Sequence, residues 1–465
     1  MIDIFSTLSQ AAKNYPNRLA IDGPTKITYS DLETSSIQVA SFLRQQGVEP
    51  GTLVLIDLPE ALAIAVEWAC WYSGFILCDY RQDAEYDFKD NQVLVSTRVK
   101  GSSIKTIEIT QRTLAEVSNS SPGGGKPFLY NDSDLAQVLM SSGTSGKPKA
   151  VGISADKILA RAKLGEHAWA LNKPVMCTMT KGTVAWTNYK IFSVLNGQTI
   201  LISTSQTQAV DLAEKYQVKT VMTSPITLKG LLDELDQKAK TLPALETIFV
   251  GGGVTPSKLA KRAESHAGVM NIYGSTEAGS ISATIYNSNS RSVGTPFEDV
   301  ELQIVNEDGQ PVPSGELGEL RYKRPSMADG YLNSETGIID GWFYPGDLAS
   351  IDHNDELLIQ GRTSETVSIG GVKVSLLDYD RVFESIPTIE DVATFSFEHN
   401  DQIQIGVAVV AGEGFNPESL SNEVYSRSPV PKIASVFQVS EIPRNANGKN
   451  QREKLAEEFS GKLSN

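Results

Sequence analysis

Before residue 291, the spacing of apolar and polar residues predicts strands that alternate with helices. Residues 31–46 carry apolar side chains at helical spacing, and Gly47 ends this run. The apolar run 52–56 is typical of a buried strand, and the apolar stretch 60–73 predicts a buried helix with two core tryptophans. Further strands are predicted at 135–140, 198–203, 219–223 and 246–250. Such alternation predicts parallel sheets covered by helices, and hence the α/β class.

The pattern changes from about residue 291. Short strands and turns rich in Pro and Gly follow, which predicts a small β-rich subdomain. The polar, Gly-rich segment 361–371, GRTSETVSIGG, suits a hinge between domains. Roughly a hundred residues remain beyond it, enough for one further small α/β domain.

Composition narrows the class of protein. The chain has 465 residues and a formal net charge of −15, which argues against nonspecific binding to nucleic acids or acidic membranes. No window approaches the ~18 apolar residues of a membrane span, and the N-terminus lacks a signal peptide pattern. Three cysteines in apolar surroundings are expected to be reduced core residues of a cytoplasmic protein. Four scattered histidines show no metal-ligand spacing.

The nine residues 141–149, SSGTSGKPK, form a short loop after the predicted strand 135–140. Their glycines let backbone N–H groups approach an anion, while the hydroxyls, Lys147 and Lys149 add donors and charge. The loop suits phosphate, although its composition equally fits a Ser/Gly-rich surface loop. It is not a Walker A loop, because the spacing G-x-x-x-x-G-K-[ST] is missing and Pro148 follows Lys147.

A second candidate segment is 271–277, NIYGSTE. The Tyr273 ring beside a glycine suits stacking on a purine, and Thr276 can donate to a phosphate. Glu277 can hold Mg²⁺ through oxygen, as hard cations prefer. The alternative is a strand-end turn with one solvated acid.

Three later segments add candidate groups. Residues 341–347, GWFYPGD, present Asp347, whose carboxylate can accept both hydroxyls of a ribose or can cap a turn. Arg362 at the predicted hinge can pair with phosphate or ribose oxygens, or can form a surface ion pair. In the tail PRNANGKNQR, an Asn-Gly turn projects Lys449, which is otherwise an ordinary solvated lysine.

Taken in order, these segments resemble the adenylate-forming (ANL) superfamily, which includes acyl-CoA synthetases, adenylation domains of nonribosomal peptide synthetases, and firefly-type luciferases. The resemblance covers nearly the whole chain, from Phe5…Tyr15-Pro16…Leu19-Ala20 through SSGTSGKPK, GGG (251–253), YGSTE, YPGD, GR and PRNANGK.

The resemblance implies a fold and a reaction. The fold is a large N-terminal adenylation domain, residues 1–362, of two α/β subdomains and a small β-barrel. A small mobile α+β domain, residues 363–465, carries the catalytic lysine. In the reaction, a carboxylic acid attacks the α-phosphate of Mg·ATP to give acyl-AMP and pyrophosphate. The acyl group then passes to the thiol of CoA or of a carrier-bound phosphopantetheine.

The resemblance also implies a role for each matching position. Lys449 would bridge the carboxylate and α-phosphate oxygens, Thr276 would contact the α-phosphate, and Glu277 would hold Mg²⁺. The loop 141–149 would hold the β- and γ-phosphates, and Asp347 the ribose. The ATP-binding residues would be Ser141, Ser142, Gly143, Thr144, Ser145, Gly146, Lys147, Lys149, Gly251, Gly252, Gly253, Asn271, Ile272, Tyr273, Gly274, Ser275, Asp347 and Arg362. The acid would lie near Thr183, Val184, Trp186, Gly252 and Ser280, and the thiol tunnel near Gly370 and Gly371.

Several positions depart from the family pattern. Ser364 stands where the hinge commonly has Asp or Lys, and Pro345 replaces the usual threonine before Gly-Asp. The segment 181–186, KGTVAW, offers no acidic residue for an α-ammonium group, which weighs against an ordinary α-amino acid. Trp186 instead suggests an aromatic or a short-to-medium acyl acid, unless it only packs in the core.

The leading interpretation is an AMP-forming acid–thiol ligase that uses ATP, Mg²⁺ and a small carboxylic acid. CoA and a carrier protein remain nearly equal candidates for the acceptor, and the oligomeric state is a monomer or a homodimer. The alternative from another class is a non-catalytic nucleotide-binding homologue, which the presence of Glu277, Asp347, Arg362 and Lys449 together disfavours. A luciferase-like oxidation rests on fold analogy alone. Neither a nucleic acid nor a membrane span is expected.

Overall fold

The computed structural model describes residues 1–82, 84, 91–98, 104–118, 125–142, 148–167, 173–287, 290–333, 338–369, 372–399, 402–412, 415–416, 433–444 and 450–460. Among these residues, no helix has both the length and the apolar character that crossing a bilayer requires.

A seven-stranded sheet forms the first layer. Five neighbouring strands in it are parallel, and the two at one edge are antiparallel to their neighbours. Parallel strands need helical crossovers, so both faces are covered, which explains the continuous apolar runs seen in the sequence. In spatial order the strands are β17 (Gly330–Tyr331), β8 (Pro148–Ser154), β7 (Leu135–Ser142), β4 (Ile76–Asp79), β3 (Leu53–Asp57), β5 (Gln92–Ser96) and β6 (Lys105–Glu108).

A five-stranded sheet forms the second α/β layer. Its order is β14 (Gly279–Ile285), β13 (Gly268–Ser275), β12 (Thr247–Val250), β11 (Thr220–Thr223) and β9 (Val175–Cys177), parallel except for β14. A short sheet of β10 (Ile200–Leu201), β1 (Leu19–Asp22) and β2 (Lys26–Thr28) lies apart from it. The predicted α/β alternation is confirmed, and every strand predicted before residue 251 overlaps an observed one.

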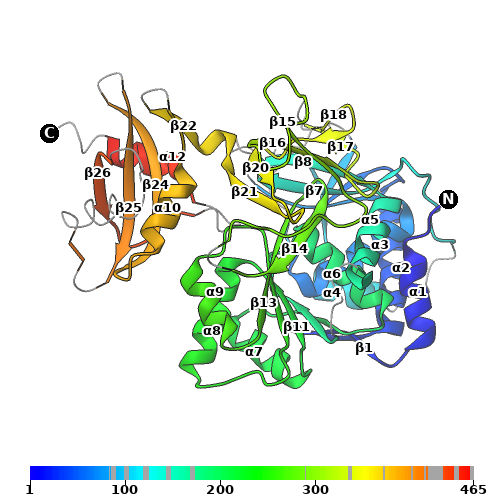
Figure 1. Ribbon diagram of the computed structural model, residues 1–465. Coiled ribbons are helices and arrows are strands. Elements are labelled where there is room, and N and C mark those ends of the chain that lie inside the picture. Colours follow the sequence, from blue (N-terminus) through cyan, green and yellow to red (C-terminus); the bar gives the residue numbers. More distant parts are fainter. Residues whose placement is uncertain are drawn as a thin grey trace.

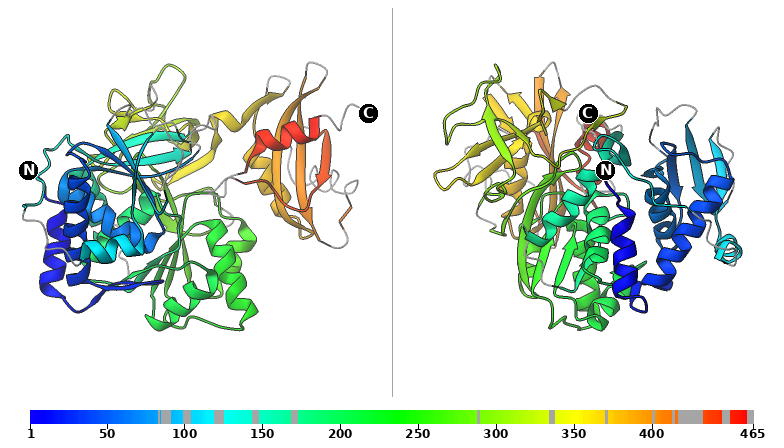
Figure 2. Two further views of the ribbon diagram at one scale, coloured as in Figure 1. Left: turned by 180° about the vertical axis from the view of Figure 1, so that it is seen from behind. Right: turned by 90° about the vertical axis from the view of Figure 1, so that its right-hand side faces the viewer.

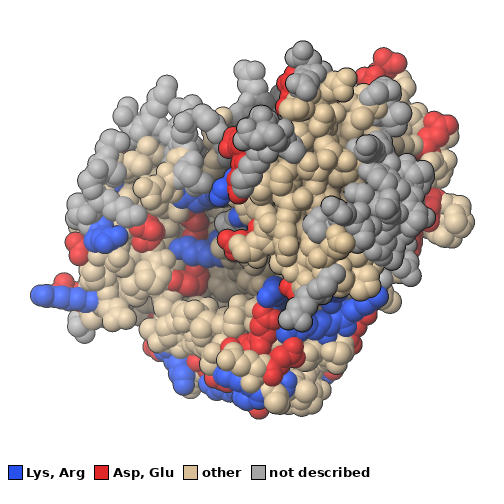
Figure 3. All heavy atoms as spheres, turned by 90° about the vertical axis from the view of Figure 1, so that its left-hand side faces the viewer, with Lys and Arg blue, Asp and Glu red and all other residues tan. Residues whose placement is uncertain are grey.

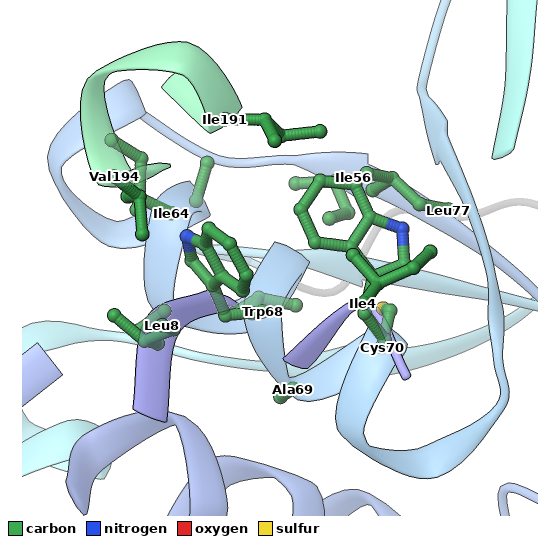
Figure 4. Close-up of a cluster of buried hydrophobic side chains, with 14 of the residues drawn as sticks. Ile4, Leu8, Ile56, Ile64, Trp68, Ala69, Cys70, Leu77, Ile191 and Val194 are labelled. Atoms are coloured by element: carbon green, nitrogen blue, oxygen red, sulfur yellow. The ribbon is translucent and has the colours of Figure 1, made fainter. Parts of the chain in front are cut away.

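Helices pack between and around these sheets (Figure 1). They are α1 (Phe5–Asn14), α2 (Tyr29–Gln45), α3 (Glu60–Ser73), α4 (Gln111–Ser118), α5 (Ala155–His167), α6 (Val184–Leu195), α7 (Gln206–Lys215), α8 (Pro225–Gln237) and α9 (Ser257–Glu264). Helix α3 is buried on all sides, since residues 62–73 are all buried, and most of them are apolar. Its Trp68 side chain lies near Leu8 of α1 and Val194 of α6 in the main hydrophobic cluster (Figure 4). Cys70, Cys78 and Cys177 are buried and free, as predicted.

The β-rich part predicted after residue 291 is a six-stranded sheet with antiparallel pairing. Its strands are β15 (Glu301–Val305), β16 (Gly318–Lys323), β18 (Ile338–Ile339), β19 (Trp342–Phe343), β20 (Asp347–Ile351) and β21 (Leu357–Arg362). The ladder between β20 and β21 pairs Asp347 with Arg362, the two candidate residues of this part.

Beyond Arg362, the chain forms a separate body, on the left in Figure 1 and on the right when seen from behind (Figure 2). Its elements are η1 (Thr363–Glu365), β22 (Thr366–Ile369), β23 (Val372–Ser375), α10 (Leu376–Glu384), β24 (Ile389–His399), β25 (Gln402–Ala411), β26 (Ser435–Gln438) and α12 (Arg452–Ser460). Every hydrophobic cluster of the described chain draws its buried residues from one side of Arg362 only.

Candidate active site

The loop 141–149 joins two antiparallel strands. Ser141 pairs with Lys149 and Ser142 with Pro148, so β7 and β8 hold the two ends of the loop side by side. The prediction that the loop leaves a buried strand is confirmed, because Val138 and Leu139 of β7 are at most 2% exposed. Gly143, Thr144, Ser145, Gly146 and Lys147 lie outside the described residues.

Tyr331 connects this loop to the segment 271–277. The ammonium group of Lys149 lies 5.0 Å from the centre of the Tyr331 ring, and the Tyr331 hydroxyl donates to Glu277 Oε1 at 2.7 Å. Burial and the Glu277 carboxylate raise the pKa of Tyr331, so the hydroxyl stays protonated and remains a donor. No sequence motif includes Tyr331, which reaches the site through the pairing of β17 with β8.

The segment 271–277 ends strand β13 and begins the tight connection to β14. A side chain at Gly274 would place its Cβ 2.3 Å from the Gly279 carbonyl oxygen, so only glycine allows this connection. Asn271, Ile272 and Tyr273 lie on β13, beside β12, and Ser275 pairs with Gly279. The carboxyl end of β12 leads into Gly251–Gly253, and the Gly251 N–H donates to the Thr223 carbonyl at 3.0 Å.

Carboxyl ends of neighbouring parallel strands are where α/β sheets usually bind ligands. Here β12 and β13 bring the GGG and YGSTE segments to one such edge. Thr276 is half-buried and Glu277 is only 6% exposed. The two segments, which lie about twenty residues apart along the chain, therefore share one edge of the sheet.

Tyr273, Asp347 and Arg362 form one polar cluster. Asp347 is 4% exposed. Its Oδ2 accepts from the Tyr273 hydroxyl, and its Oδ1 lies 3.1 Å from Arg362 Nε. Burial and the Asp347 carboxylate raise the pKa of Tyr273 well above its usual value. The structure thus joins the β-rich sheet to the end of β13 through three residues that the sequence had placed in separate motifs.

Ser280 lines a small hollow beside the Thr276 turn, with a volume of about 10 Å³, which is room for roughly one water molecule. The walls combine the apolar side chains of Leu164 and Phe297 with the Asn188 amide and two guanidinium groups. The residues that line it are Arg161, Leu164, Asn188, Gly279, Ser280, Phe297 and Arg324.

Comparison with known proteins connects this geometry to a family. Residues 8–332 match the family described as AMP-binding enzyme. The chain belongs to the AMP-binding enzyme family. The 2-succinylbenzoate–CoA ligase of Bacillus cereus is 26% identical, over 96% of this chain and 97% of the ligase. Tyrocidine synthase 3 of Brevibacillus parabrevis is 27% identical over 97% of this chain, which spans only 8% of that protein.

The fold of this AMP-binding enzyme also matches solved structures. The O-succinylbenzoate coenzyme A synthetase of Bacillus subtilis, in complex with AMP, superposes with a TM-score of 0.84 at 21% identity, covering 97% of both chains. The same synthetase in complex with ATP and magnesium ion also gives a TM-score of 0.84 at 21% identity, covering 97% of this chain and 98% of the synthetase. The predicted adenylate-forming superfamily and its mixed α/β fold are confirmed.

The donor set of this AMP-binding enzyme fits a magnesium ion bound together with nucleotide. Within the described residues, no group of three or more His, Cys, Asp or Glu side chains gathers as a metal cage. Mg²⁺ commonly uses one or two carboxylates and completes its shell with phosphates and water. The carboxylate of Glu277, buried and held by Tyr331 through one oxygen, can play that part.

The structure places the expected substrate segment, residues 181–186, against the hydrophobic core. Trp186 is only 5% exposed, packs in the main hydrophobic cluster, and donates from Nε1 to Glu60 Oε1 at 2.7 Å. These contacts fit the packing alternative, and a role for Trp186 in the acid site stays a prediction. Thr183 caps helix α6, Val184 packs against the same cluster, and Gly252 is exposed. Of the five predicted pocket residues, Ser280 is the one that lines the hollow.

Acidic residues do stand near the segment 181–186, although none is adjacent in the sequence. Glu60 of α3 contacts Trp186, and Asp79 lies 3.1 Å from Lys181. Lys190 of α6 pairs with both Glu60 and Glu67. Contacts between α3 and α6 bring these groups together, which a reading of local sequence could not reveal.

Three predicted groups remain outside the described residues: Lys449, Gly370 and Gly371. The chain on both sides of residues 445–449 is described. Arg444 forms an isolated antiparallel β-bridge with Asn450, and its side chain forms an ion pair with Asp391 at 2.7 Å. Arg452 forms an ion pair with Asp380 at 2.6 Å. Ser364, at the expected hinge, lies in the single turn η1.

Proposed function

We propose that this AMP-binding enzyme is an ATP-dependent acid–thiol ligase that forms an acyl-AMP and then transfers the acyl group to a thiol. The observation that carries the proposal is the convergence of Lys149, Tyr331 and Glu277 with the Tyr273–Asp347–Arg362 cluster at the carboxyl edge of β12 and β13. A nucleotide needs phosphate, ribose and metal contacts in one place, and this edge offers candidates for all three.

The first step joins two anions. A carboxylate oxygen attacks the α-phosphorus of ATP, and the bond from that phosphorus to the bridging oxygen of pyrophosphate breaks. The residues of this chain lower the barrier by position: Thr276 donates to the α-phosphate, the loop 141–149 holds the departing phosphates, and Asp347 with Arg362 holds the ribose. Lys449 would bridge the attacking carboxylate and the α-phosphate. When bound at Glu277, Mg²⁺ supplies charge neutralisation for the phosphates.

The second step uses the same site with a thiol as the attacking reactant. The thiol sulfur attacks the acyl carbon, and AMP leaves as the carbon–oxygen bond of the acyl-AMP breaks. A lysine carried on a separate domain can be withdrawn between the two steps. We propose accordingly that residues 1–362 form the adenylation domain, that residues 363–465 form the mobile domain, and that Gly370 and Gly371 border the thiol path.

The acid is proposed to be aromatic or of short to medium length. The proposed contacts for this acid are Thr183, Val184, Trp186, Gly252 and Ser280, and Ser280 lies beside the apolar side chains of Phe297 and Leu164. An α-amino acid is disfavoured, because the carboxylates near α6 are already paired with Lys190. The ligase from Bacillus cereus is named for 2-succinylbenzoate, which is itself an aromatic acid.

CoA is the proposed acceptor. This chain matches 97% of a protein named as a CoA ligase, whereas it matches 8% of tyrocidine synthase 3. On the face shown in Figure 3, the coloured acidic and basic side chains are interspersed, which gives no broad basic surface for a nucleic acid. We propose a cytoplasmic monomer or homodimer with no nucleic acid partner.

The test is acid-dependent ATP–pyrophosphate exchange over a panel of aromatic, short-chain and α-amino acids, with and without Lys449→Ala. We expect exchange with an aromatic or a short-chain acid and a loss of about 10²- to 10³-fold in Lys449→Ala. Absence of exchange with every acid, by folded protein that binds ATP, would instead favour a non-catalytic nucleotide-binding protein. Trapping the acyl-AMP with CoA or with a phosphopantetheinylated carrier then separates the acceptors.

A further inference from the structure

Arg161 lies beneath the turn that carries Thr276 and Glu277. It belongs to α5, which directly follows β8 and thus the returning strand of the loop 141–149. Its side chain is buried, with the residue only 4% exposed. The guanidinium group donates to three carbonyl oxygens: Nε to Ser326 at 2.8 Å, Nη1 to Thr276 at 3.0 Å, and Nη2 to Glu277 at 2.5 Å.

The turn depends on these bonds because the β13–β14 ladder ends at Ser275 and Gly279. The Thr276 and Glu277 carbonyls therefore need partners outside the ladder, and a buried carbonyl without a partner is costly. Arg161 supplies one to each, and the Ala328 N–H supplies a second to Glu277 at 2.7 Å. Arg324 continues the pattern, since its Nη1 donates to the carbonyls of Ala278 and Ser280.

The charge of Arg161 is unusual for a purely packing residue. Arg324 pairs with Asp299, at 2.6 Å, whereas Arg161 forms no ion pair with any described residue. Burial and the neighbouring Arg324 lower the pKa of Arg161 to about 10, which still leaves it protonated at neutral pH. The carboxylates of Glu277 and Asp329 act in the opposite direction and raise the pKa of Arg161. A buried guanidinium held by carbonyls alone is expensive, so an apolar residue would serve packing better.

We propose that Arg161 is a positioning residue for acyl-AMP formation: it fixes the backbone that aims the Thr276 hydroxyl at the α-phosphate and the Glu277 carboxylate at the metal. This inference rests on the proposed function of the site. Helix α5 follows β8, the strand that leaves the loop 141–149. Arg161 therefore also connects the part of the site that holds the departing phosphates to the part that contacts the α-phosphate. A displacement of about 1 Å at such groups can cost on the order of 10²-fold in rate.

The experiment compares wild type with Arg161→Met, Arg161→Lys and a matched control, Arg18→Met. Arg18 likewise donates to a backbone carbonyl, that of Gly197 at 2.8 Å, but lies in the N-terminal part of the chain, outside every candidate segment. Two quantities are measured: the kcat and KM of ATP–pyrophosphate exchange, and the gain in affinity for a fluorescent ATP analogue when Mg²⁺ is added. The second needs no turnover and reports on Glu277 directly.

We expect Arg161→Met to lose about 10²-fold in kcat, to change the KM for the acid little, and to lose most of the Mg²⁺-dependent gain in ATP affinity. Arg161→Lys, which keeps the charge but not the planar fork, should recover part of both. Arg18→Met should retain both the kcat and the Mg²⁺-dependent gain in affinity within about twofold, because Arg18 is exposed.

Two outcomes would overturn the assignment. One is wild-type exchange and Mg²⁺ response in Arg161→Met. The other is an equal loss in kcat and thermal stability in Arg161→Met and Arg18→Met, which would make Arg161 merely structural. If Arg161→Met does not fold, Arg161→Lys decides, and unaltered kinetics in that variant would also reject the proposal. Absence of exchange by wild type would reject the proposed function itself, a result distinguishable from unchanged exchange in the variants.

Discussion

At the scale of single residues, Asp347 shows how a buried carboxylate is prepared for a ligand. Its two oxygens are already turned in different directions, one toward the Tyr273 hydroxyl and one toward Arg362. Both partners are donors, so the carboxylate is held in a fixed orientation. In the proposed site, a ribose that donates two hydroxyls would meet an acceptor that is already oriented.

Asp347→Asn should therefore weaken ATP binding selectively. The amide loses the charge and replaces one acceptor oxygen by a donor that faces Tyr273 or Arg362. Hydrogen bonds to charged groups contribute about 1.5–3 kcal/mol, so we expect the KM for ATP in pyrophosphate exchange to rise roughly 10- to 150-fold. Asp308→Asn, on an exposed turn, is the matched control and should leave this KM unchanged. An unchanged KM in Asp347→Asn would remove Asp347 from the ribose site.

At the scale of elements, the apolar pattern predicted the helices at 31–46 and 60–73 and five strands before residue 251, because these elements bury one face or all faces. Residues 60–73 were apolar enough to predict α3, and 135–140 to predict β7. Contacts made across the fold left no such signal. Tyr331 reaches Glu277 only because β17 pairs with β8, and Trp186 points into the core because α6 packs near α3. The motif residues were found by type and order, while their supporting residues required the tertiary structure.

The pairing of α3 with α6 contains a buried charge cluster. Lys190, 4% exposed at its side chain, contacts Glu67 and lies 3.4 Å from Glu60. Two carboxylates thus share one ammonium group. Burial raises the pKa of Glu67 to about 7, with Lys190 acting in the opposite direction. A carboxyl group with a raised folded-state pKa contributes stability below about pH 4.5, and that contribution is lost as pH rises through 7.

Lys190→Met should destabilise the protein strongly and in a pH-dependent way. Removing one partner of a buried pair costs about 3–5 kcal/mol, because the remaining charge is uncompensated. Without Lys190, the pKa of Glu67 rises further, so the loss should be largest at pH 8 and smaller at pH 5, where Glu67 is neutral. Urea unfolding at both pH values measures this. Lys229→Met, which breaks an exposed helical pair with Asp233, should cost less than about 1 kcal/mol at either pH. A pH-independent loss in Lys190→Met would contradict the argument.

At the scale of the whole molecule, the body beyond Arg362 is set apart from the rest (Figure 2), and polar contacts between described residues connect the two. Lys258 of α9 donates to the carbonyls of Pro387, at 3.1 Å, and Ile389. Arg291 lies 2.9 Å from Asp378 of α10. Since the hydrophobic clusters of the described residues do not cross Arg362, we expect polar contacts such as these to stabilise this arrangement of the two bodies.

The double variant Lys258→Ala/Arg291→Ala should depopulate this arrangement without unfolding either body. The contacts of these two partly exposed side chains together contribute about 1–3 kcal/mol, which corresponds to a roughly 5- to 150-fold shift between orientations. Single-molecule FRET measures it with dyes on cysteines introduced at Lys229 and Glu390, because the three native cysteines are buried. The population that matches wild type should fall, and added salt should lower it in wild type as well, since the Arg291–Asp378 pair is exposed enough to be screened. Lys219→Ala, which breaks an exposed pair with Glu246, should leave the FRET distribution unchanged.

Identical distributions in the double variant and wild type would mean that other contacts hold the two bodies. A shift accompanied by altered rates of one half-reaction only would show that each orientation serves a different step.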